Sequence, residues 1–267
     1  MSERIKELIQ ILNRASHAYY NEDTEILSNL EYDNLYDELT KLESDTGIIY
    51  ANSPTQKVGF EVVGSLQKVP HETPLLSLDK TKESDALMSF LGSHNGLLSW
   101  KLDGLRIVLK YVNGQLSQAL TRGNGVIGED VTHNAKFFRN IPLTLPHKGT
   151  FLIQGEAVIK NSDFEAIIKT EDYKNPRNLC SGTVRQLSSE TAAKRPIYFY
   201  AFSLINSTDF TSKIEQLKWI KSQGFDPVEH YPVDSDSLLN ILNDFKNKLN
   251  TTDVASDGLV LTFDNIE

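Results

Sequence analysis

An apolar, β-rich run from Gly96 to Tyr111 contains the tetrapeptide Lys101-Leu102-Asp103-Gly104. Successive side chains on a strand point to opposite faces, so Lys101 and Asp103 are expected to share a face. A lysine held beside a carboxylate at the end of a buried strand is a candidate nucleophile toward a phosphate. Gly104 would let a ligand approach the backbone closely. Alone, the tetrapeptide also fits an edge-strand lysine followed by an ordinary turn.

Strand-like and helical segments alternate irregularly after this run. Strand patterns cover Gln115–Thr121, Phe151–Ile159, Ile197–Leu204 and Gly258–Phe263. Helical patterns cover Asp85–Leu91, Ser162–Thr170, Thr211–Ser222 and Ser237–Lys248. Several strands follow one another without an intervening helix, which favours an α+β fold with antiparallel sheets over a doubly wound Rossmann sheet.

The glycines of Thr121-Arg122-Gly123-Asn124-Gly125 and Gly128 happen to match the dinucleotide-binding pattern Gly-x-Gly-x-x-Gly. The pattern follows a strand, but neither a crossover helix nor a suitably spaced acidic residue completes the unit. We therefore interpret this segment as a tight turn rather than as a Rossmann motif.

The first 65 residues have a different character. Apolar residues recur at helical spacing in residues 3–47, and Ser28-Asn29 predicts the N-terminal cap of a second helix. Residues 50–72 lose this periodicity and carry several prolines and glycines, which indicates a linker. The sequence therefore predicts a small helical subdomain over residues 1–65 and a larger domain over residues 66–267.

Composition limits the classes of protein to be considered. The 267 residues include one cysteine, Cys180, which excludes an internal disulfide framework and a cysteine-rich zinc site. There is no apolar run of transmembrane length and no signal-peptide pattern, so a reducing cytoplasm is expected. The formal net charge of −9 argues against a free-standing, sequence-independent DNA clamp. A local basic face, or alternatively scattered solvated cations, would comprise Lys174, Arg177, Arg185, Lys194 and Arg195.

Many short segments in register carry a resemblance to a known family. They are Ala18-Tyr19-Tyr20, Glu31-Tyr32-Asp33, Asn52–Gly59, His71–Asp79, Lys101–Gly104, Thr121–Thr132, Gly155-Glu156, Asn175–Asn178, Val184–Gln186 and Ser256–Leu261. In this order and at this spacing the sequence resembles the adenylation region of the bacterial NAD-dependent DNA ligases. The resemblance covers the chain from about residue 5 to its last residue.

The resemblance implies a fold and a reaction. The fold would be a helical subdomain that binds nicotinamide mononucleotide, followed by an ATP-grasp-like, DNA-ligase nucleotidyltransferase core of antiparallel sheets with flanking helices. The core would be incomplete at its C-terminal end. The reaction would form a lysyl-AMP intermediate from NAD, with Mg²⁺, for sealing nicks in duplex DNA through a longer parent protein.

The resemblance also implies roles for particular residues. Lys101 would be the nucleophile, with Asp103 and Glu156 as further catalytic groups. The remaining nucleotide contacts would be Ser77, Leu78, Arg122, Arg177, Arg185 and Asp257. In the helical subdomain, the nicotinamide mononucleotide would contact Tyr19, Tyr20, Tyr32 and Asp33. Metal ligands are not specified by the sequence.

Four positions depart from the family pattern, and each replaces a charged residue by a neutral one. Ser99 stands where a glutamate is expected, Asn29 and Asn124 where aspartates are expected, and Thr262 where a lysine should meet the α-phosphate. Loss of a phosphate-facing cation weakens stabilisation of the transition state. The chain also ends before the final lysine motif of the family, so efficient nick sealing by this chain alone is not expected.

Two other functions are compatible with parts of the sequence. A divergent, catalytically impaired relative that binds NAD, adenylate or a partner would account for Ser99 and Thr262. An ATP-dependent ligase or capping-type enzyme would share the lysine motif. It would not explain Tyr19-Tyr20 and Glu31-Tyr32-Asp33.

Overall fold

The computed structural model describes residues 2–21, 26–56, 64–75, 78–206, 209–249 and 251–266. The chain divides into two compact units, Met1–Phe60 and Glu61–Glu267. Within the described ranges no helix is long and apolar enough to cross a membrane.

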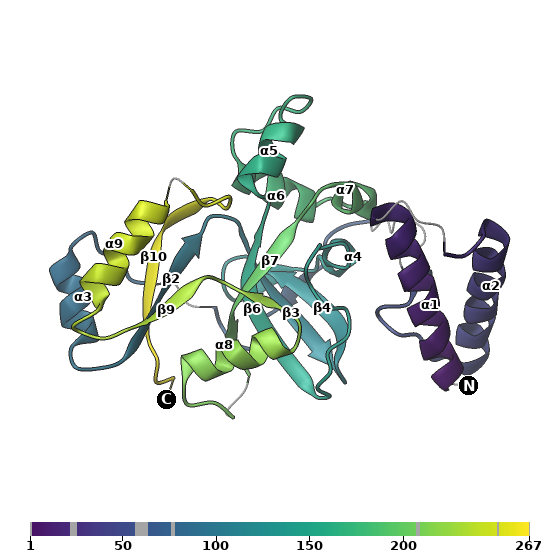
Figure 1. Ribbon diagram of the computed structural model, residues 1–267, viewed down its shortest axis with the longest axis horizontal. Coiled ribbons are helices and arrows are strands. Elements are labelled where there is room, and N and C mark those ends of the chain that lie inside the picture. The colour runs from purple at the N-terminus through teal and green to yellow at the C-terminus, as the bar shows by residue number, and fades with distance from the viewer. Residues whose placement is uncertain are drawn as a thin grey trace. The chain divides into compact units, whose positions relative to one another are not determined.

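The first unit is a helical hairpin. Helices α1 (Ser2–Asn21) and α2 (Asn29–Thr46) lie side by side, and a 3₁₀ turn, η1 (Pro54–Gln56), follows them (Figure 1). The predicted periodicity of α1 is confirmed, because its apolar stripe is the buried core of this unit. The stripe and the residue of α2 that it packs against are Ile5, Leu8, Ile9, Leu12 and Leu39.

Local interactions fix both ends of α2. The Ser28 hydroxyl accepts a hydrogen bond from the Glu31 amide, and the Glu31 carboxylate accepts one from the Ser28 amide. This capping box confirms the predicted N-terminal cap. At the other end Gly47 adopts φ 67°, a left-handed conformation that glycine takes without strain.

The second unit is built around a five-stranded sheet. Its strand order is β4-β3-β6-β7-β8, and all neighbours are antiparallel except β7 and β8. The strands are β3 (Leu105–Val112), β4 (Gln115–Thr121), β6 (Thr150–Val158), β7 (Tyr198–Leu204) and β8 (Asp226–Pro227).

One face of this sheet is closed by helix α8 (Lys213–Ser222), which lies against β7 and β8 (Figure 1). Alternate strand residues point into the buried layer, where the Tyr111 and Phe225 rings meet edge to face at 5.7 Å. Because side chains alternate, the intervening residues of β3 and β6 point to the opposite face. That face carries the candidate site.

A three-stranded antiparallel sheet completes the core of the second unit. Its order is β10-β2-β9, with strands β10 (Ser256–Phe263), β2 (Gly96–Leu102) and β9 (His230–Val233). Helices α3 (Ser84–Leu91) and α9 (Leu238–Lys248) bury its apolar side chains. The Trp100 ring packs edge to face against Phe245 with centroids 4.7 Å apart.

Short elements connect and flank the two sheets. Strands β1 (Lys68–Pro70) and β5 (Ile127–Glu129) form a two-stranded ladder. The remaining helices are α4 (Thr132–Ala135), α5 (Asn161–Ile167), α6 (Pro176–Val184) and α7 (Ser189–Lys194).

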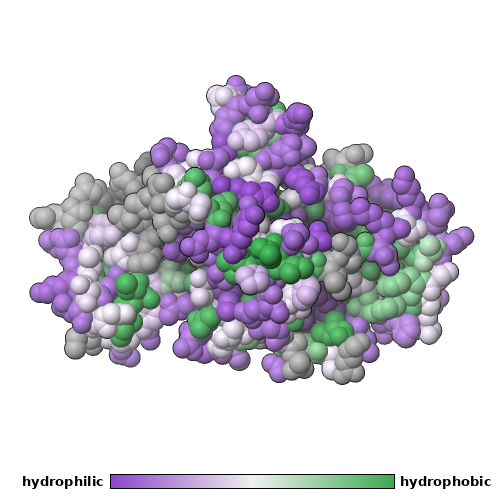
Figure 2. Space-filling view, turned by 180° about the vertical axis from the view of Figure 1, so that it is seen from behind, coloured by the Kyte–Doolittle hydropathy of each residue, from purple (hydrophilic) through white to green (hydrophobic). Residues whose placement is uncertain are grey.

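On the face drawn in Figure 2, hydrophilic residues predominate and hydrophobic residues form small separate groups.

The α+β prediction with antiparallel sheets is confirmed, but three details differ. The predicted run Gly96–Tyr111 is two strands, β2 and β3, which turn at Asp103-Gly104 and belong to different sheets. The predicted linker contains η1 and β1, while residues 57–63 lie outside the described ranges. Helices α6 and α7 were not predicted because both are short and mix polar with apolar residues.

Candidate functional site

Lys101 lies near the end of β2, and its ammonium contacts a carboxylate from the neighbouring strand β10. Its Nζ is 2.5 Å from Asp257 Oδ1 and 2.6 Å from Oδ2. The Lys101 and Asp257 side chains are 36% and 44% exposed, so solvent reaches both partners. The structure therefore presents the candidate nucleophile at the surface, held by one carboxylate.

A β-bulge brings Asp257 to this position. Ser256 pairs with Leu102 and Gly258 pairs with Lys101, which leaves Asp257 as the extra residue of β10. Bulges re-aim a side chain that regular pairing would direct elsewhere. Gly258 has φ 153°, a conformation that L side chains rarely adopt.

Asp103 follows β2 and pairs with an arginine from helix α6. Arg177 Nη1 donates to Asp103 Oδ1 at 2.7 Å. Asn175 caps α6 by accepting a hydrogen bond from the Asn178 amide, which places Arg177 in the first helical turn. The hydrogen bond with Asp103 raises the pKa of Arg177, so this guanidinium stays charged.

Gly104 lies where the chain passes from one sheet to the other. A Cβ atom at this position would lie 2.1 Å from the Ala157 carbonyl oxygen and 2.8 Å from Val158 Cγ1. The group that approaches Gly104 is therefore the protein's own backbone, where the sequence suggested a ligand. Gly155 is similar, because a Cβ there would meet the Phe199 ring at 2.4 Å.

Glu156 is the partly buried carboxylate of the site. It projects from β6 directly opposite Arg106 of β3, and the Gly104 amide donates a hydrogen bond to it. Burial raises the pKa of Glu156 to about 7, although Arg106, Arg177 and the Gly104 amide act in the opposite direction. Nearby Asp103 adds to the increase.

Arg106 was missed by sequence reasoning. It belongs to no motif, yet the structure places it between Glu156 and Arg122 on the open face of the five-stranded sheet. The signal in the sequence is an arginine within the apolar strand Leu105–Val112, where an unexplained cation is unusual.

Arg122 lies in the turn that follows β4, as predicted. Its amide donates to the Arg106 carbonyl oxygen at 3.0 Å, and its own carbonyl oxygen accepts from the Gly125 amide. His71 Nε2 lies 3.1 Å from the same Arg122 carbonyl oxygen. Gly123, with φ 55°, supplies the left-handed residue that the turn requires.

The cations considered for a local basic face are largely neutralised by carboxylates. Arg185 Nε donates to Glu129 Oε2 at 2.7 Å. Four of the five cations named for that face are in ion pairs with carboxylates. The pairs are Arg177–Asp103, Arg185–Glu129, Lys194–Glu190 and Arg195–Glu171.

The residues expected to bind nicotinamide mononucleotide are only partly described. Tyr32 is half-buried against the core of the first unit, and its ring stacks on Tyr36 at 6.4 Å. This contact gives Tyr32 a packing role. The side chains of Tyr19, Tyr20 and Asp33, and the whole of Ser77, lie outside the described part of the chain. Leu78 is described and is 47% exposed.

The sequence was compared with models of known protein families. The model of the NAD-dependent DNA ligase adenylation domain matches residues 63–267. The chain belongs to the NAD-dependent DNA ligase family. A second model, the N-terminal NAD⁺-binding domain of DNA ligase-like proteins, matches residues 1–59.

Individual relatives support this assignment. The chain is 52% identical over 272 residues to a DNA ligase of Lachnoclostridium phytofermentans, covering 99% of this chain and 42% of the relative. It is 48% identical over 270 residues to a DNA ligase of Ruminiclostridium cellulolyticum, covering 98% of this chain and 41% of the relative. The chain thus spans about two fifths of the length of these relatives. Among solved structures, an archaeal ATP-dependent RNA ligase matches 87% of this chain and 62% of the length of the RNA ligase chain. The TM-score is 0.48 and the sequence identity is 14%, so this similarity carries no functional argument.

The structure locates the departures from the ligase family pattern. Asn124 Oδ1 accepts hydrogen bonds from the Val126 and Ile127 amides at 2.9 and 2.8 Å, which an aspartate could also do. Ser99 and Thr262 lie on β2 and β10, in the sheet that carries Lys101. Asn29 begins α2, and its side chain lies outside the described part.

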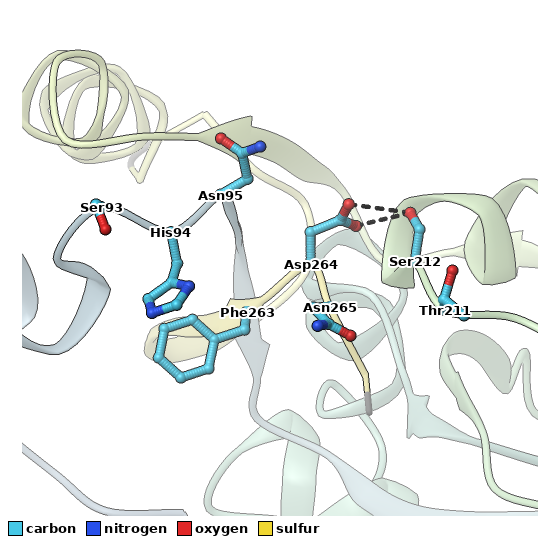
Figure 3. A pocket seen from close by; sticks show the side chains of 8 residues that line it. All are labelled: Ser93, His94, Asn95, Thr211, Ser212, Phe263, Asp264 and Asn265. Carbon is cyan, nitrogen blue, oxygen red and sulfur yellow. Dashed lines mark hydrogen bonds between the residues drawn. The ribbon is translucent and has the colours of Figure 1, made fainter.

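Two pockets in the second unit lie apart from this charged cluster. The larger, about 770 Å³, is lined by residues just before β2, residues just before α8, and residues at and just after the end of β10. There the Asp264 carboxylate accepts hydrogen bonds from Ser212, and His94 lies beside Phe263 (Figure 3). The smaller, about 190 Å³, lies farther along the open face of the five-stranded sheet, near Val108 and Lys110. Neither pocket is lined by Lys101, Glu156 or Asp257.

Proposed function

We propose that this chain is the adenylation part of an NAD-dependent DNA ligase and that Lys101 carries the AMP. The observation that carries the proposal is Lys101 Nζ held by Asp257 within one cluster with Asp103, Arg177 and Glu156. Membership of the ligase family supports the choice of NAD as the AMP donor.

The proposed step is a substitution at the α-phosphorus of NAD. A P–N bond forms to Lys101 Nζ, and the P–O bond to nicotinamide mononucleotide breaks. An amine attacks only as the neutral form, so the ammonium must first lose a proton. Both Asp257 oxygens lie within hydrogen-bonding distance of Nζ, which makes Asp257 the nearest described acceptor for that proton.

Charged groups from both sheets would orient the nucleotide. Arg122 and Glu156 are suited to the ribose and phosphate, since a guanidinium donates in a fork and a carboxylate accepts from hydroxyls. Arg177 and Arg185 would act at the edge of the site, where each is now held by a carboxylate. Ser77 and Leu78 would line the adenine pocket.

We propose that the first unit binds the nicotinamide mononucleotide moiety through Tyr19, Tyr20, Tyr32 and Asp33. An aromatic ring can stack on the pyridinium ring, and a carboxylate can pair with its positive charge. The match of residues 1–59 to an NAD⁺-binding domain supports this role.

The residues present are compatible with Mg²⁺ as the metal. No group of three His, Cys, Asp or Glu side chains suited to a metal occurs in the described part of the chain. Mg²⁺ is commonly held by one or two carboxylates together with substrate phosphates. Glu156 and Asp103, which lie close enough to influence each other, would hold it, and it would neutralise phosphate charge when bound.

The proposed acceptor of the AMP is the 5′-phosphate of nicked duplex DNA, bound through a longer parent protein. DNA repair and replication in the cytoplasm are the processes that would use this chemistry.

Intact mass spectrometry after incubation with NAD and Mg²⁺, beside an ATP incubation, tests the proposal. We expect an increase of one AMP with NAD only, mapped by peptide digestion to Lys101. An adduct formed equally from ATP would contradict the assignment of the donor. An adduct mapped elsewhere would contradict the assignment of the nucleophile.

A further inference from the structure

Three side chains lie in a row across adjacent strands β3, β6 and β7 of the five-stranded sheet, and a fourth follows in the turn after β4. Arg106 is directly opposite Glu156, and Glu156 is directly opposite Tyr200. On the other side of Arg106, the Arg122 amide donates to the Arg106 carbonyl oxygen. Directly opposite residues of antiparallel strands share a face. Arg106, Glu156 and Tyr200 therefore share one face, and Arg122 lies close enough to influence the charge of Arg106.

The environment of Arg106 holds its guanidinium in place but opposes its charge. Its Cζ lies 5.5 Å from the centroid of the Phe202 ring, a cation–π distance. Burial lowers the pKa of Arg106, Glu156 raises it, and the neighbouring Arg122 lowers it further. Glu156, directly opposite on β6, attracts this guanidinium.

The guanidinium groups of Arg106 and Arg122 repel each other, and an anion placed between them removes that repulsion. In a nucleotide the only strong anions are the phosphates. The sheet that carries Lys101 has the neutral Thr262 where the family pattern has a phosphate-facing lysine. Positive charge from the other sheet would serve the same phosphate.

We infer that Arg106 is a nucleotide-binding residue that, together with Arg122, contacts the phosphate of the adenylate. This inference rests on the proposed function for the position of the nucleotide. It assigns the phosphate contact to a residue outside every motif of the chain. The role requires a guanidinium or another cation at position 106, not merely a side chain that fills space over Phe202.

Calorimetric binding of AMP and of adenosine to the full chain tests this inference. Arg106→Gln should weaken AMP binding about 10- to 100-fold, as expected for a lost charge-assisted hydrogen bond, and leave adenosine binding unchanged. Arg106→Lys, which keeps the charge, should lose less AMP affinity. Arg139→Gln removes an exposed arginine of the same unit and is the charge-matched control, expected to bind both ligands as wild type does.

An equal loss of AMP and adenosine affinity in Arg106→Gln would overturn the inference, because a structural role would weaken both ligands. Unchanged affinity for both would also overturn it. If Arg106→Gln does not fold, Arg106→Lys decides, since an unchanged ratio of AMP to adenosine affinity would refute the phosphate contact.

The result of this binding test can be distinguished from the result of the adduct test for the proposed function. A wild-type chain that forms no AMP adduct with NAD, but whose Arg106→Gln variant selectively loses AMP affinity, would refute adenylation and support the phosphate contact. An adduct on Lys101 together with an unchanged AMP-to-adenosine ratio in Arg106→Gln would refute only the role of Arg106.

Discussion

The two sheets of the second unit hold their charged residues in different ways. In the three-stranded sheet, Lys101 and Asp257 form an ion pair that is more than one-third exposed on both sides. In the five-stranded sheet, Glu156 is partly buried beside Arg106, and this burial raises its pKa to about 7. An exposed pair is screened by solvent and easily exchanged, whereas a buried carboxylate depends on its neighbours. The two sheets therefore differ in how strongly solvent screens their charged groups.

The largest expected effect comes from removing the nucleophile. Lys101→Ala should abolish the AMP adduct formed from NAD, because no other amine is placed against Asp257 in the described part of the chain. The measurement is intact mass after incubation with NAD and Mg²⁺. Lys194→Ala, which removes an exposed lysine paired with Glu190, is the control and should retain the adduct. An undiminished adduct in Lys101→Ala would show that the nucleophile lies elsewhere.

The second prediction concerns Glu156, the partly buried carboxylate of the five-stranded sheet. Because the folded-state pKa of Glu156 is raised from 4.5 to about 7, the folded protein keeps this proton while the unfolded chain releases it. The contribution to the free energy of unfolding is fully present below pH 4.5 and falls as the pH rises to about 7, by up to about 3 kcal/mol.

Urea unfolding of wild type and Glu156→Gln at several pH values measures this contribution. Relative to the variant, wild type should lose stability between pH 4.5 and 7 and change little above that range. Glu190→Gln removes an exposed carboxylate and gives the baseline for losing one negative charge. A constant difference between wild type and Glu156→Gln across this range would mean that Glu156 is solvated like the exposed pair.

The third prediction concerns the junction between the sheets. Gly104→Ala would place a Cβ 2.1 Å from the Ala157 carbonyl oxygen, so backbone must shift. We expect a loss of about 1–3 kcal/mol in the free energy of unfolding, typical of overpacking. Gly64→Ala is the matched control, since nothing lies within 4 Å of a Cβ there. A change there of about 0.5 kcal/mol or less is expected. Equal losses in the two variants would show that the junction tolerates a side chain.

The smallest expected effect is on the exposed ion pair. A double-mutant cycle with Lys101→Met and Asp257→Asn should give a coupling energy of about 1 kcal/mol or less, because both side chains are solvent-accessible. Raising the salt concentration should reduce it. A coupling energy above about 2 kcal/mol would mean that the Lys101–Asp257 pair is as strong as a buried ion pair, and the proposed difference between the two sheets would be wrong.

Much of the fold could be predicted because its signals are local. The apolar stripe of α1, the Ser28 cap of α2 and the alternating residues of β4 and β6 all follow from short-range periodicity. The turn at Arg122 follows from its flanking glycines. The division of the run Gly96–Tyr111 into two strands at Asp103-Gly104 was not predicted, because apolar residues continue on both sides of it. Periodicity alone cannot assign two consecutive strands to two different sheets.

The sequence predicted which residues belong to the candidate site, but it did not predict which of them contact one another. Lys101, Asp257 and Glu156 were named from the family resemblance, whereas their partners came from the structure. Arg106 had no motif to mark it, since its significance depends on lying opposite Glu156 and beside Arg122. Of the two alternatives for the clustered cations, a basic face is largely excluded by ion pairs, two of which join distant segments, Arg177–Asp103 and Arg185–Glu129.

Residue order and short-range spacing were enough to predict the helical first unit, the strand-rich second unit and the ligase family. The contact of Lys101 with Asp257, which a bulge 156 residues away presents, and the pairing of Arg177 with Asp103 became evident from the folded structure alone. Strand register and burial arise from packing of the whole unit, and they set which charges meet and how strongly water screens them.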